Sequence, residues 1–259
     1  MSLTRRRFLA ASAGLAFAGL APYSRGFAQQ NLSPIKAIAF DAFPIFDPRP
    51  VFGLTKKLFP EHGMNFAVLW RTRIFEYTWL LTNSGRYQSF WQCINDALSF
   101  TANQLNVSLS AKQRDQLMNA FLSLKAYPDV KPVLEQFKRN GIKLAFLSNM
   151  TEKMLNSGIA NSSLAGYFDE VLSTDRVKAF KPDPRAYQMA IDAFGFNKQQ
   201  IVFCAFASWD AIGAKWFGYP TVWVNRLSFK AETLPAKPDA VGTDIQALKT
   251  FIAQRQHLA

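Results

Sequence analysis

Short apolar runs alternate with amphipathic segments along most of the chain, and this alternation predicts its elements. The runs Lys36 to Asp41 and Ile142 to Leu147 have the length and composition of buried strands. Later runs with the same pattern are Phe168 to Ser173, Ile201 to Phe206 and Thr221 to Val224. Apolar residues recur at helical spacing in segments that begin near Glu152, Pro184 and Asp210. Helices that alternate with strands are typical of a parallel sheet covered on both faces.

The segment from Phe52 to Lys125 carries only helical periodicity. Phe66, Leu69 and Trp70 begin it, and the period continues from Phe90 to Leu105 and from Ala111 to Leu124. Because no strand pattern interrupts this segment, the sequence predicts a helical cap, residues 51–126, inserted after the first strand. Residues 35–50 and 127–259 would then form one α/β domain, a Rossmann-like core with a parallel sheet.

Polar and charged side chains follow several of these predicted strands. Asp41 ends the first apolar run, and Ser148 with Asn149 ends the second. Lys181 follows the third strand, and Asp210 opens the helix after the fourth. Singly, each has a structural explanation, as a turn residue, a helix cap or a surface cation. Ligands of open α/β sheets bind outside the carboxyl ends of the strands, so together these residues predict one functional site.

The first 28 residues read as an export signal. Arg5, Arg6 and Arg7 precede an apolar stretch from Phe8 to Leu20, and small residues surround a cleavage site at Gly26-Phe27-Ala28. The block TRRRFLA resembles a twin-arginine signal, which implies a periplasmic protein exported in the folded state. A Sec signal or a retained anchor are the alternatives. The stretch is shorter than the roughly 20 apolar residues of a spanning helix, so no stable membrane span is expected after signal removal.

Charge changes this picture only a little. The formal net charge is +12, and four arginines of the predicted signal contribute to it without any acid. Lys56-Lys57 and the pair Lys112 and Arg114 are short, scattered groups, so we expect solvated faces rather than a nucleic-acid site. A basic chain of this kind suits a small anionic substrate.

The chain has few thiol or imidazole side chains that could bind a metal or activate a nucleophile. The chain has two cysteines, Cys93 and Cys204, and two histidines, His62 and His257. Buried, unpaired thiols are expected, although an exported protein could form a disulfide. With no histidine cluster and no histidine next to a nucleophile, the chemistry narrows to carboxylates, Lys, Arg and hydroxyls.

The chain resembles the haloacid dehalogenase superfamily, and within it the type II (S)-2-haloacid dehalogenases. The blocks that carry the resemblance are FDAFPIFD, LWRTRIFEYTWLL, GRYQSFWQ, LSNMT, FKPDPRAY and SWDAIGAKWFGYPTVWVNR, from about Ile35 to Arg226. The resemblance implies a Rossmann-like core with a helical cap after the first strand, in agreement with the periodicity. It implies hydrolytic dehalogenation of short (S)-2-haloacids to (R)-2-hydroxyacids, without a metal or other cofactor, and a possible homodimer.

The resemblance also implies a role for each matching residue. Asp41 would be the nucleophile that forms an aspartyl ester. Arg71 would take the halide, and Ser148 with Asn149 would bind the substrate carboxylate. The other implied catalytic residues are Lys181 and Tyr187, which support nucleophile and intermediate, and Asp210, which positions water. The other implied substrate contacts are Ala42, Phe43, Phe75, Phe90 and Trp209, of which the last three would form an apolar wall.

Departures from the family pattern define two alternatives. A magnesium-dependent phosphatase of the superfamily would carry an Asp two residues after the nucleophile, where this chain has Phe43. The loop FPIF is one residue shorter than the family loop and lacks its Thr, and Ala205 and Ala207 replace a Ser and an Asn. Ser208 is the nearest hydroxyl that could compensate. Loss of those groups would slow ester hydrolysis, so a periplasmic anion-binding protein with weak or lost turnover is the second alternative.

Overall fold

The core is a parallel sheet whose central strand delivers Asp41. The computed structural model describes residues 33–257, and the predicted signal lies outside this range. Within it, the sheet has six strands in the order β3-β2-β1-β4-β5-β6, and all neighbouring strands are parallel. Their bounds are β1 (Ala37–Phe40), β2 (Lys143–Ser148), β3 (Glu170–Ser173), β4 (Ile201–Ala205), β5 (Thr221–Val224) and β6 (Ala240–Gly242). This agrees with the α/β fold that the sequence predicts.

Strand register brings three loops to one edge of the sheet. Phe40 is paired with Phe146 of β2 on one side and with Cys204 of β4 on the other. Because the strands are parallel and aligned here, their carboxyl ends meet. The segments that follow β1, β2 and β4 therefore begin side by side.

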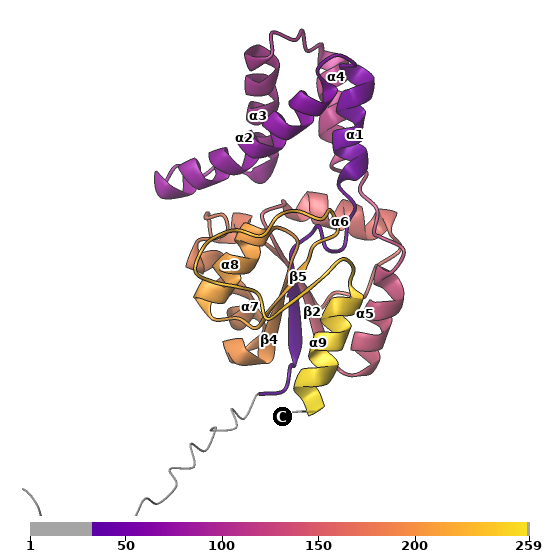
Figure 1. Cartoon of the computed structure of the whole chain (residues 1–259), viewed down its shortest axis with the longest axis vertical. Coiled ribbons are helices and arrows are strands. Elements are labelled where there is room, and N and C mark those ends of the chain that lie inside the picture. The colour runs from indigo at the N-terminus through magenta and orange to yellow at the C-terminus, as the bar shows by residue number, and fades with distance from the viewer. Residues whose placement is uncertain (1–32, 258–259) are drawn as a thin grey trace, which may run out of the picture. The chain divides into compact units, whose positions relative to one another are not determined.

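Alternation along β1 explains why helices cover both faces. Ile38 and Phe40 belong to one buried cluster, and Ala37 and Ala39 belong to the other. The first cluster includes residues of α5 (Val130–Arg139), α6 (Glu152–Asn161) and α9 (Gln246–His257). The second includes residues of α7 (Pro184–Phe194) and α8 (Ser208–Phe217), which lie on the opposite side of the sheet in Figure 1. Larger side chains on one face of β1 and alanines on the other thus set the packing of the two helix layers.

The segment after β1 is helical, as its periodicity indicates. Its helices are α1 (Arg49–Leu58), α2 (Gly63–Asn83), α3 (Phe90–Gln104) and α4 (Ala111–Ala120), drawn together in Figure 1. Ser89 caps α3 by accepting a bond from the Gln92 N–H at 3.3 Å, and Ser110 forms a capping box with Gln113 at the start of α4. The indole of Trp70 donates to the Ile94 carbonyl at 3.0 Å, which ties α2 to α3. The boundaries 51 and 126 of the cap stay predictions, and α1 begins two residues before the first of them.

Two elements near the C-terminus and one helix start differ from the sequence analysis. β6 has only three residues, which are partly or fully exposed, and no periodic pattern marks it or α9. α8 begins at Ser208, so Asp210 lies in its first turn and does not open it. In the sequence the apolar run of β4 continues to Phe206, so the pattern does not show where the helix starts.

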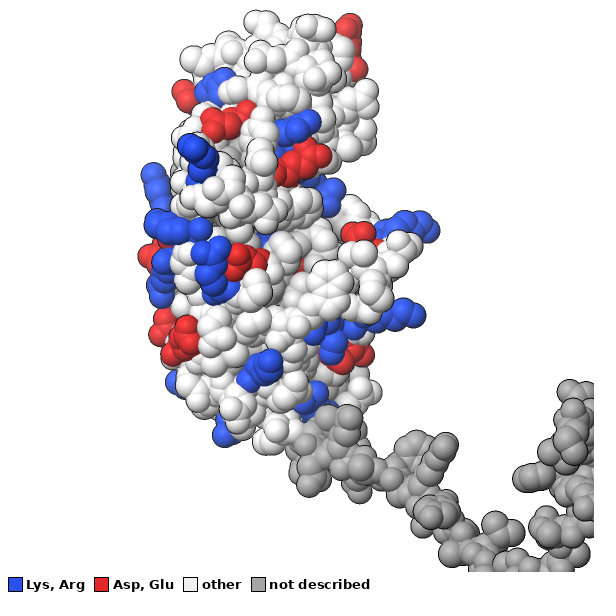
Figure 2. Space-filling view, turned by 90° about the vertical axis from the view of Figure 1, so that its left-hand side faces the viewer, with Lys and Arg blue, Asp and Glu red and all other residues white. Residues whose placement is uncertain are grey.

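The structure of residues 33–257 also bears on the cysteines, on membrane-spanning helices and on the surface charge. Cys93 and Cys204 are free and buried, as expected of structural thiols. In the part of the chain that the structure describes, no helix combines the length and the apolar character that a membrane crossing requires. On the face in Figure 2, basic side chains are interspersed with acidic ones, which fits solvated faces.

The packing of α6 against the hinge of the cap gives a test of the fold. A Cβ added at Gly158 would lie 2.7 Å from the ring of Phe46, which is fully buried and stacked on Phe146 at 5.2 Å. We expect Gly158→Ala to lower Tm by roughly 2–6 °C, because overpacking costs about 1–3 kcal/mol and outweighs the gain in helix propensity. The matched control is Gly53→Ala in α1, whose added Cβ meets nothing within 4 Å. Its Tm should stay equal or rise, and equal Tm changes in both variants would contradict this account of the packing.

Candidate active site

The side chains that follow β1, β2 and β4 meet at the carboxyl edge of the sheet. Asp41 comes directly after β1, and its N–H donates to the Cys204 carbonyl of β4 at 3.0 Å. Ser148 is the last residue of β2, and Asn149 follows it. Asp210 is brought in by the first turn of α8. The convergence that the strand pattern predicts is present in the structure.

Lys181 lies between two carboxylates. Its Nζ donates to Asp41 Oδ1 at 2.9 Å and to Asp210 Oδ2 at 2.5 Å, and its side chain is 1 % exposed. Its backbone N–H donates to Asn149 Oδ1 at 3.0 Å, which fixes the loop that carries it. Burial alone would lower the pKa of Lys181, but Asp210 and Asp41 outweigh burial and raise this pKa above its ordinary value. The ammonium therefore stays charged and holds both carboxylates.

Asp210 is the more deeply buried acid of the cluster, with 1 % exposure. Burial raises its pKa to about 6; Lys181 opposes the rise and the Asp41 carboxylate adds to it. One of its oxygens accepts from Lys181, and the other accepts from the Tyr187 hydroxyl at 2.7 Å. An acid with such a pKa can accept a proton from water near neutral pH.

Tyr187 contacts Asp210. From the sequence, Tyr187 is expected to support the nucleophile and the intermediate. Its hydroxyl bonds to Asp210 and its side chain is fully buried beneath the site. A Cβ on Gly213 would lie 2.5 Å from this hydroxyl, so the glycine leaves the space that the phenol needs. The structure thus shows a bond from Tyr187 to Asp210, and the expected role of Tyr187 at the nucleophile stays a prediction.

An unpaired amide faces the site next to Ser148. Asn149 is 4 % exposed, and among the described residues its Nδ2 has no hydrogen-bond partner, whereas Ser148 Oγ accepts from the Met150 N–H at 3.2 Å. A buried donor without a partner costs about 1–3 kcal/mol, so a ligand oxygen at this point would be stabilised. The pair is suited to bind an anionic group.

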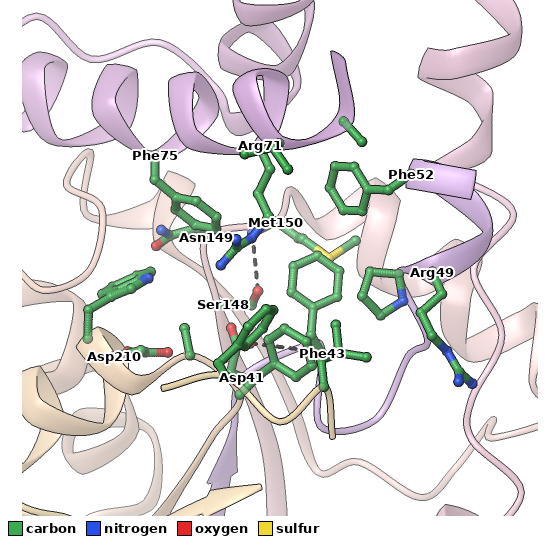
Figure 3. Close-up of a pocket in the computed structure, with 18 of the residues that line it drawn as sticks. Asp41, Phe43, Arg49, Phe52, Arg71, Phe75, Ser148, Asn149, Met150 and Asp210 are labelled. Atoms are coloured by element: carbon green, nitrogen blue, oxygen red, sulfur yellow. Dashed lines mark hydrogen bonds between the residues drawn. The ribbon is translucent and has the colours of Figure 1, made fainter. Parts of the chain in front are cut away.

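Arg71 brings a positive charge from the cap. It lies on α2 and points into the cavity from above Asp41 in Figure 3. Burial lowers the pKa of Arg71, and within residues 33–257 no carboxylate forms an ion pair with it. Its guanidinium lies 4.7 Å from the centre of the Phe229 ring, which supports its position by a cation–π contact. A guanidinium without an acid partner is available to an anion in the cavity.

These groups open into one cavity of about 440 Å³ between cap and core. Aromatic rings form much of its wall: Phe75, Phe90 and Trp209 line it, as the sequence analysis expects, and Phe75 lies 5.3 Å from Trp209. Figure 3 shows Asp41, Ser148, Asn149 and Arg71 around its centre. The full set of sequence-predicted residues that line the cavity is Asp41, Phe43, Arg71, Phe75, Phe90, Ser148, Asn149, Lys181, Trp209 and Asp210.

Ala42 is a correction to the predicted site. Its side chain is fully buried in the hydrophobic core, and it is absent from the cavity wall. The chain turns after Asp41, so that Phe43 faces the cavity and Ala42 faces the opposite way. Phe43 also donates its N–H to Asp41 Oδ2 at 3.2 Å. Adjacent positions in this turn thus have different surroundings.

The polar groups that the family pattern would supply near Asp210 are absent. Ala207 lines the cavity, whereas Ala205 is fully buried in β4. Ser208 does not replace them, because its Oγ accepts from the Glu232 N–H at 2.9 Å and it lies outside the cavity wall. Lys181 and the Phe43 N–H already donate to Asp41, at 2.9 and 3.2 Å.

The donor set does not fit a divalent cation. Such an ion needs several oxygen ligands, but the Lys181 ammonium already binds one oxygen of Asp41 and one of Asp210. Phe43 places a ring where a metal-dependent relative would carry a carboxylate. Across the described residues no group of three or more His, Cys, Asp and Glu side chains could hold a metal.

Comparison with known proteins agrees with this geometry. The model of the haloacid dehalogenase-like hydrolases matches residues 49–218. The chain belongs to this hydrolase family. A relative in Pseudomonas sp. (strain YL), an (S)-2-haloacid dehalogenase, is 39 % identical over 215 residues, which are 83 % of this chain and 93 % of that protein. Haloacetate dehalogenase H-2 of Moraxella sp. (strain B) is 34 % identical over 86 % of this chain and all of its own length.

Solved structures of haloacid dehalogenases superpose on the described part of the chain. A crystal structure of an L-2-haloacid dehalogenase, 37 % identical, has a TM-score of 0.83 and covers 85 % of this chain and 100 % of its own. The L-2-haloacid dehalogenase of Xanthobacter autotrophicus, with chloropropionic acid covalently bound, is 29 % identical. It has a TM-score of 0.77 and covers 85 % of this chain and 98 % of its own. Cap and core are thus both shared with this family.

Some residues of the cavity wall have no clear signal in the sequence. Phe206, Phe229 and Phe52 line the cavity, yet none was identified as a site residue. Phe206 follows a buried strand and reads as its continuation, and Phe52 reads as part of an amphipathic helix. Phe229 lies beyond the family blocks, and Asn225 holds its backbone by two hydrogen bonds. The pair of Asn225 and Phe229 could have suggested an ordered loop, but not its position over Arg71.

The pKa of Asp210 predicts an acid limb in the activity of this hydrolase. Below pH 6 Asp210 becomes protonated and can no longer accept a proton from water, so kcat should fall about tenfold per pH unit. Tyr187→Phe removes a hydrogen bond that stabilises the carboxylate, so the acid limb should move upward by about one pH unit. Profiles of kcat at saturating substrate from pH 4.5 to 8 measure both effects. A flat wild-type profile, or an unmoved limb in Tyr187→Phe, would contradict the assigned roles.

Proposed function

We propose that this protein hydrolyses the carbon–halogen bond of (S)-2-haloacids and releases (R)-2-hydroxyacids and halide. The observation that carries this function is the arrangement of a carboxylate between anion-binding groups. Asp41 is held by Lys181 at 2.9 Å, and the cavity above it contains the unpaired Arg71 and the free amide of Asn149. A substrate with one carboxylate and one departing halide supplies the two anions that these groups can bind.

In the first step a carboxylate oxygen of Asp41 attacks C2 of the substrate. The new C–O bond forms as the carbon–halogen bond breaks, and the halide leaves with the bonding electrons on the side of Arg71. Attack from the opposite side inverts C2. The substrate carboxylate lies against Ser148 and Asn149, so C2 is presented to Asp41, and the product of this step is an aspartyl ester.

In the second step water attacks the carbonyl carbon of the ester. Asp210 takes a proton from the water, and the tetrahedral oxygen receives bonds from Lys181 and from the Phe43 N–H, which already lie near the Asp41 oxygens. On collapse the C–O bond to the substrate breaks, its alkoxide oxygen takes the proton from Asp210 to give the hydroxyacid, and the Asp41 carboxyl loses its proton to solvent. The structure of the Xanthobacter autotrophicus relative with chloropropionic acid covalently bound supports a covalent route.

The two alternatives are less well supported. A phosphatase would need a cation and a second acid near Asp41, where Lys181 and Phe43 lie instead. A binding protein without turnover would not need the buried acid Asp210 with its raised pKa. Either alternative predicts a distinct result in the assay below.

Halide release tests the proposed function directly. We expect chloride from chloroacetate and from (S)-2-chloropropionate, little from the (R)-enantiomer, and full activity in EDTA. Asp41→Asn should lower the rate by about 10³-fold or more, because it removes the nucleophile but keeps its shape. Release of phosphate from p-nitrophenyl phosphate with Mg²⁺, or binding of haloacid without any chloride, would favour one of the alternatives.

The replacement of family polar groups by Ala205 and Ala207 predicts which step is slow. Loss of a hydrogen bond that positions a reacting group typically costs about 10² or more in rate, so ester hydrolysis should limit turnover. Rapid mixing should show a burst of halide equal to the enzyme concentration, with an adduct visible by intact mass.

The double variant Ala205→Ser, Ala207→Asn should raise steady-state turnover by about tenfold or more if it restores the water site. Ser208→Ala is the control, since its hydroxyl accepts from the Glu232 N–H and should matter little for the rate. Linear halide release with no adduct, together with an unimproved double variant, would show that the remaining donors already position the water.

We further propose that the protein reaches the periplasm by the twin-arginine route, which the block TRRRFLA and the small residues before Gln29 support. Changing Arg5, Arg6 and Arg7 to Lys should leave the precursor in the cytoplasm, as measured by fractionation and immunoblotting. The control changes Lys56 and Lys57 to Arg. Undiminished periplasmic recovery of the first variant would reject this route.

A further inference from the structure

The cavity is larger than a short haloacid requires. A three-carbon 2-chloroacid has six non-hydrogen atoms, and at the ~30 Å³ that a water molecule occupies in the liquid these fill roughly 180 Å³. The cavity has about 440 Å³. More than half of its volume therefore remains after a substrate of that size has reached Asp41.

The remaining space lies on the side of α1 and of the start of α2. In Figure 3 Phe75 and Asp210 lie to one side of Asp41 and Arg71, and Phe52 and Arg49 lie to the other. We call this second side the distal compartment, and its wall consists of Pro48, Phe52, Gly53, Met64 and Val68. It is separate from the aromatic wall that faces Asp210.

The wall of the distal compartment is apolar and well supported. Phe52 packs edge-on against Trp70 and Phe121, with ring centres 5.9 and 6.3 Å apart, so its ring is held in place. Met64 and Val68 are one turn apart on α2 and are 57 % and 56 % exposed, so they form an apolar rim open to solvent.

The compartment offers no strong site for a second anion. Arg49 at its edge is engaged by both oxygens of Asp47, at 2.9 Å and 2.6 Å. Lys56, also at the edge, is exposed, where water and salt weaken its attraction for charge. A polar or doubly charged substrate would therefore gain little here, whereas an apolar chain would lose contact with water.

We propose that the distal compartment binds the alkyl chain of longer 2-haloacids, and that Gly53, Phe52 and Val68 determine chain-length specificity. The unfilled volume takes about eight more non-hydrogen atoms, which corresponds to 2-haloalkanoic acids of up to about eleven carbons. This inference rests on the proposed function. In this inference the alkyl chain of the substrate occupies the distal compartment, which the groups that react at C2 do not fill.

Chain-length dependence of kcat/KM tests the inference. The substrates are the (S)-2-bromo derivatives of propanoate, hexanoate and octanoate, below their critical micelle concentrations. Each buried methylene contributes about 0.8 kcal/mol, so kcat/KM should rise about two- to fourfold per added carbon. Equal or falling values from propanoate to octanoate would overturn the proposal while halide release from propanoate leaves the proposed function intact.

Variants on α1 and α2 identify the compartment. An added Cβ at Gly53 meets nothing within 4 Å, so Gly53→Leu can fill the space without moving the backbone. We expect Gly53→Leu and Val68→Phe each to lower the octanoate-to-propanoate ratio of kcat/KM by about tenfold or more. Val241→Phe is the matched control and should keep this ratio within about twofold of wild type, since Val241 is as exposed as Val68, at 56 %, but lies outside the cavity wall. Wild-type ratios in both larger variants would overturn the assignment.

Binding without turnover separates this inference from the proposed function. Isothermal titration calorimetry with octanoate and propanoate measures the distal contacts when no halide is present. Tighter binding of octanoate that Gly53→Leu abolishes supports the compartment even if no substrate releases halide, in which case only the proposed function fails. Equal affinities for both acids would overturn the compartment.

Discussion

The ammonium of Lys181 holds two carboxylates, Asp41 and Asp210, at distances of 2.9 and 2.5 Å inside the protein. Three charges with a net negative sum are costly to bury, and removal of one partner of such a group typically destabilises by about 3–5 kcal/mol. The rest of the fold meets this constraint by delivering each side chain from a separate, rigid element. β1 supplies Asp41, the first turn of α8 supplies Asp210, and the Asn149 side chain fixes the backbone of Lys181.

The net negative charge of the cluster also explains why the site needs anion-binding groups in addition to Lys181. The net negative charge of the cluster repels an anionic substrate, so binding needs separate positive and hydrogen-bonding groups. Arg71 arrives from α2 of the cap, and Phe229 supports it from a loop of the core. Asn149 serves both groups, because its oxygen accepts from the Lys181 backbone N–H while its amide nitrogen has no partner among the described residues. Cap and core are thus both required to complete the site.

Much of the fold and of the site could be predicted from the sequence, because strand-end polar residues follow recognisable apolar runs. Asp41, Ser148, Lys181 and Asp210 all come together as the pattern indicates. The prediction was wrong for Ala42, since sequence proximity to the nucleophile does not fix the direction of a side chain in a turn. The hydrogen bond from Tyr187 to Asp210 could not be predicted, because a buried tyrosine can reach several acids and only the packing decides which. Phe229 and the distal compartment depend on contacts between cap and core, which periodicity does not encode.

The formation of an ester on Asp41 is the central claim, and a single turnover in ¹⁸O water tests it most directly. With enzyme in excess over (S)-2-chloropropionate, the oxygen added to the product comes from Asp41, and solvent oxygen replaces it in the carboxylate. The account predicts a nearly unlabelled hydroxyacid and ¹⁸O in the peptide that contains Asp41, both measured by mass spectrometry. Full labelling of the hydroxyacid in the first turnover, with no label in that peptide, would show direct attack by water and contradict the account.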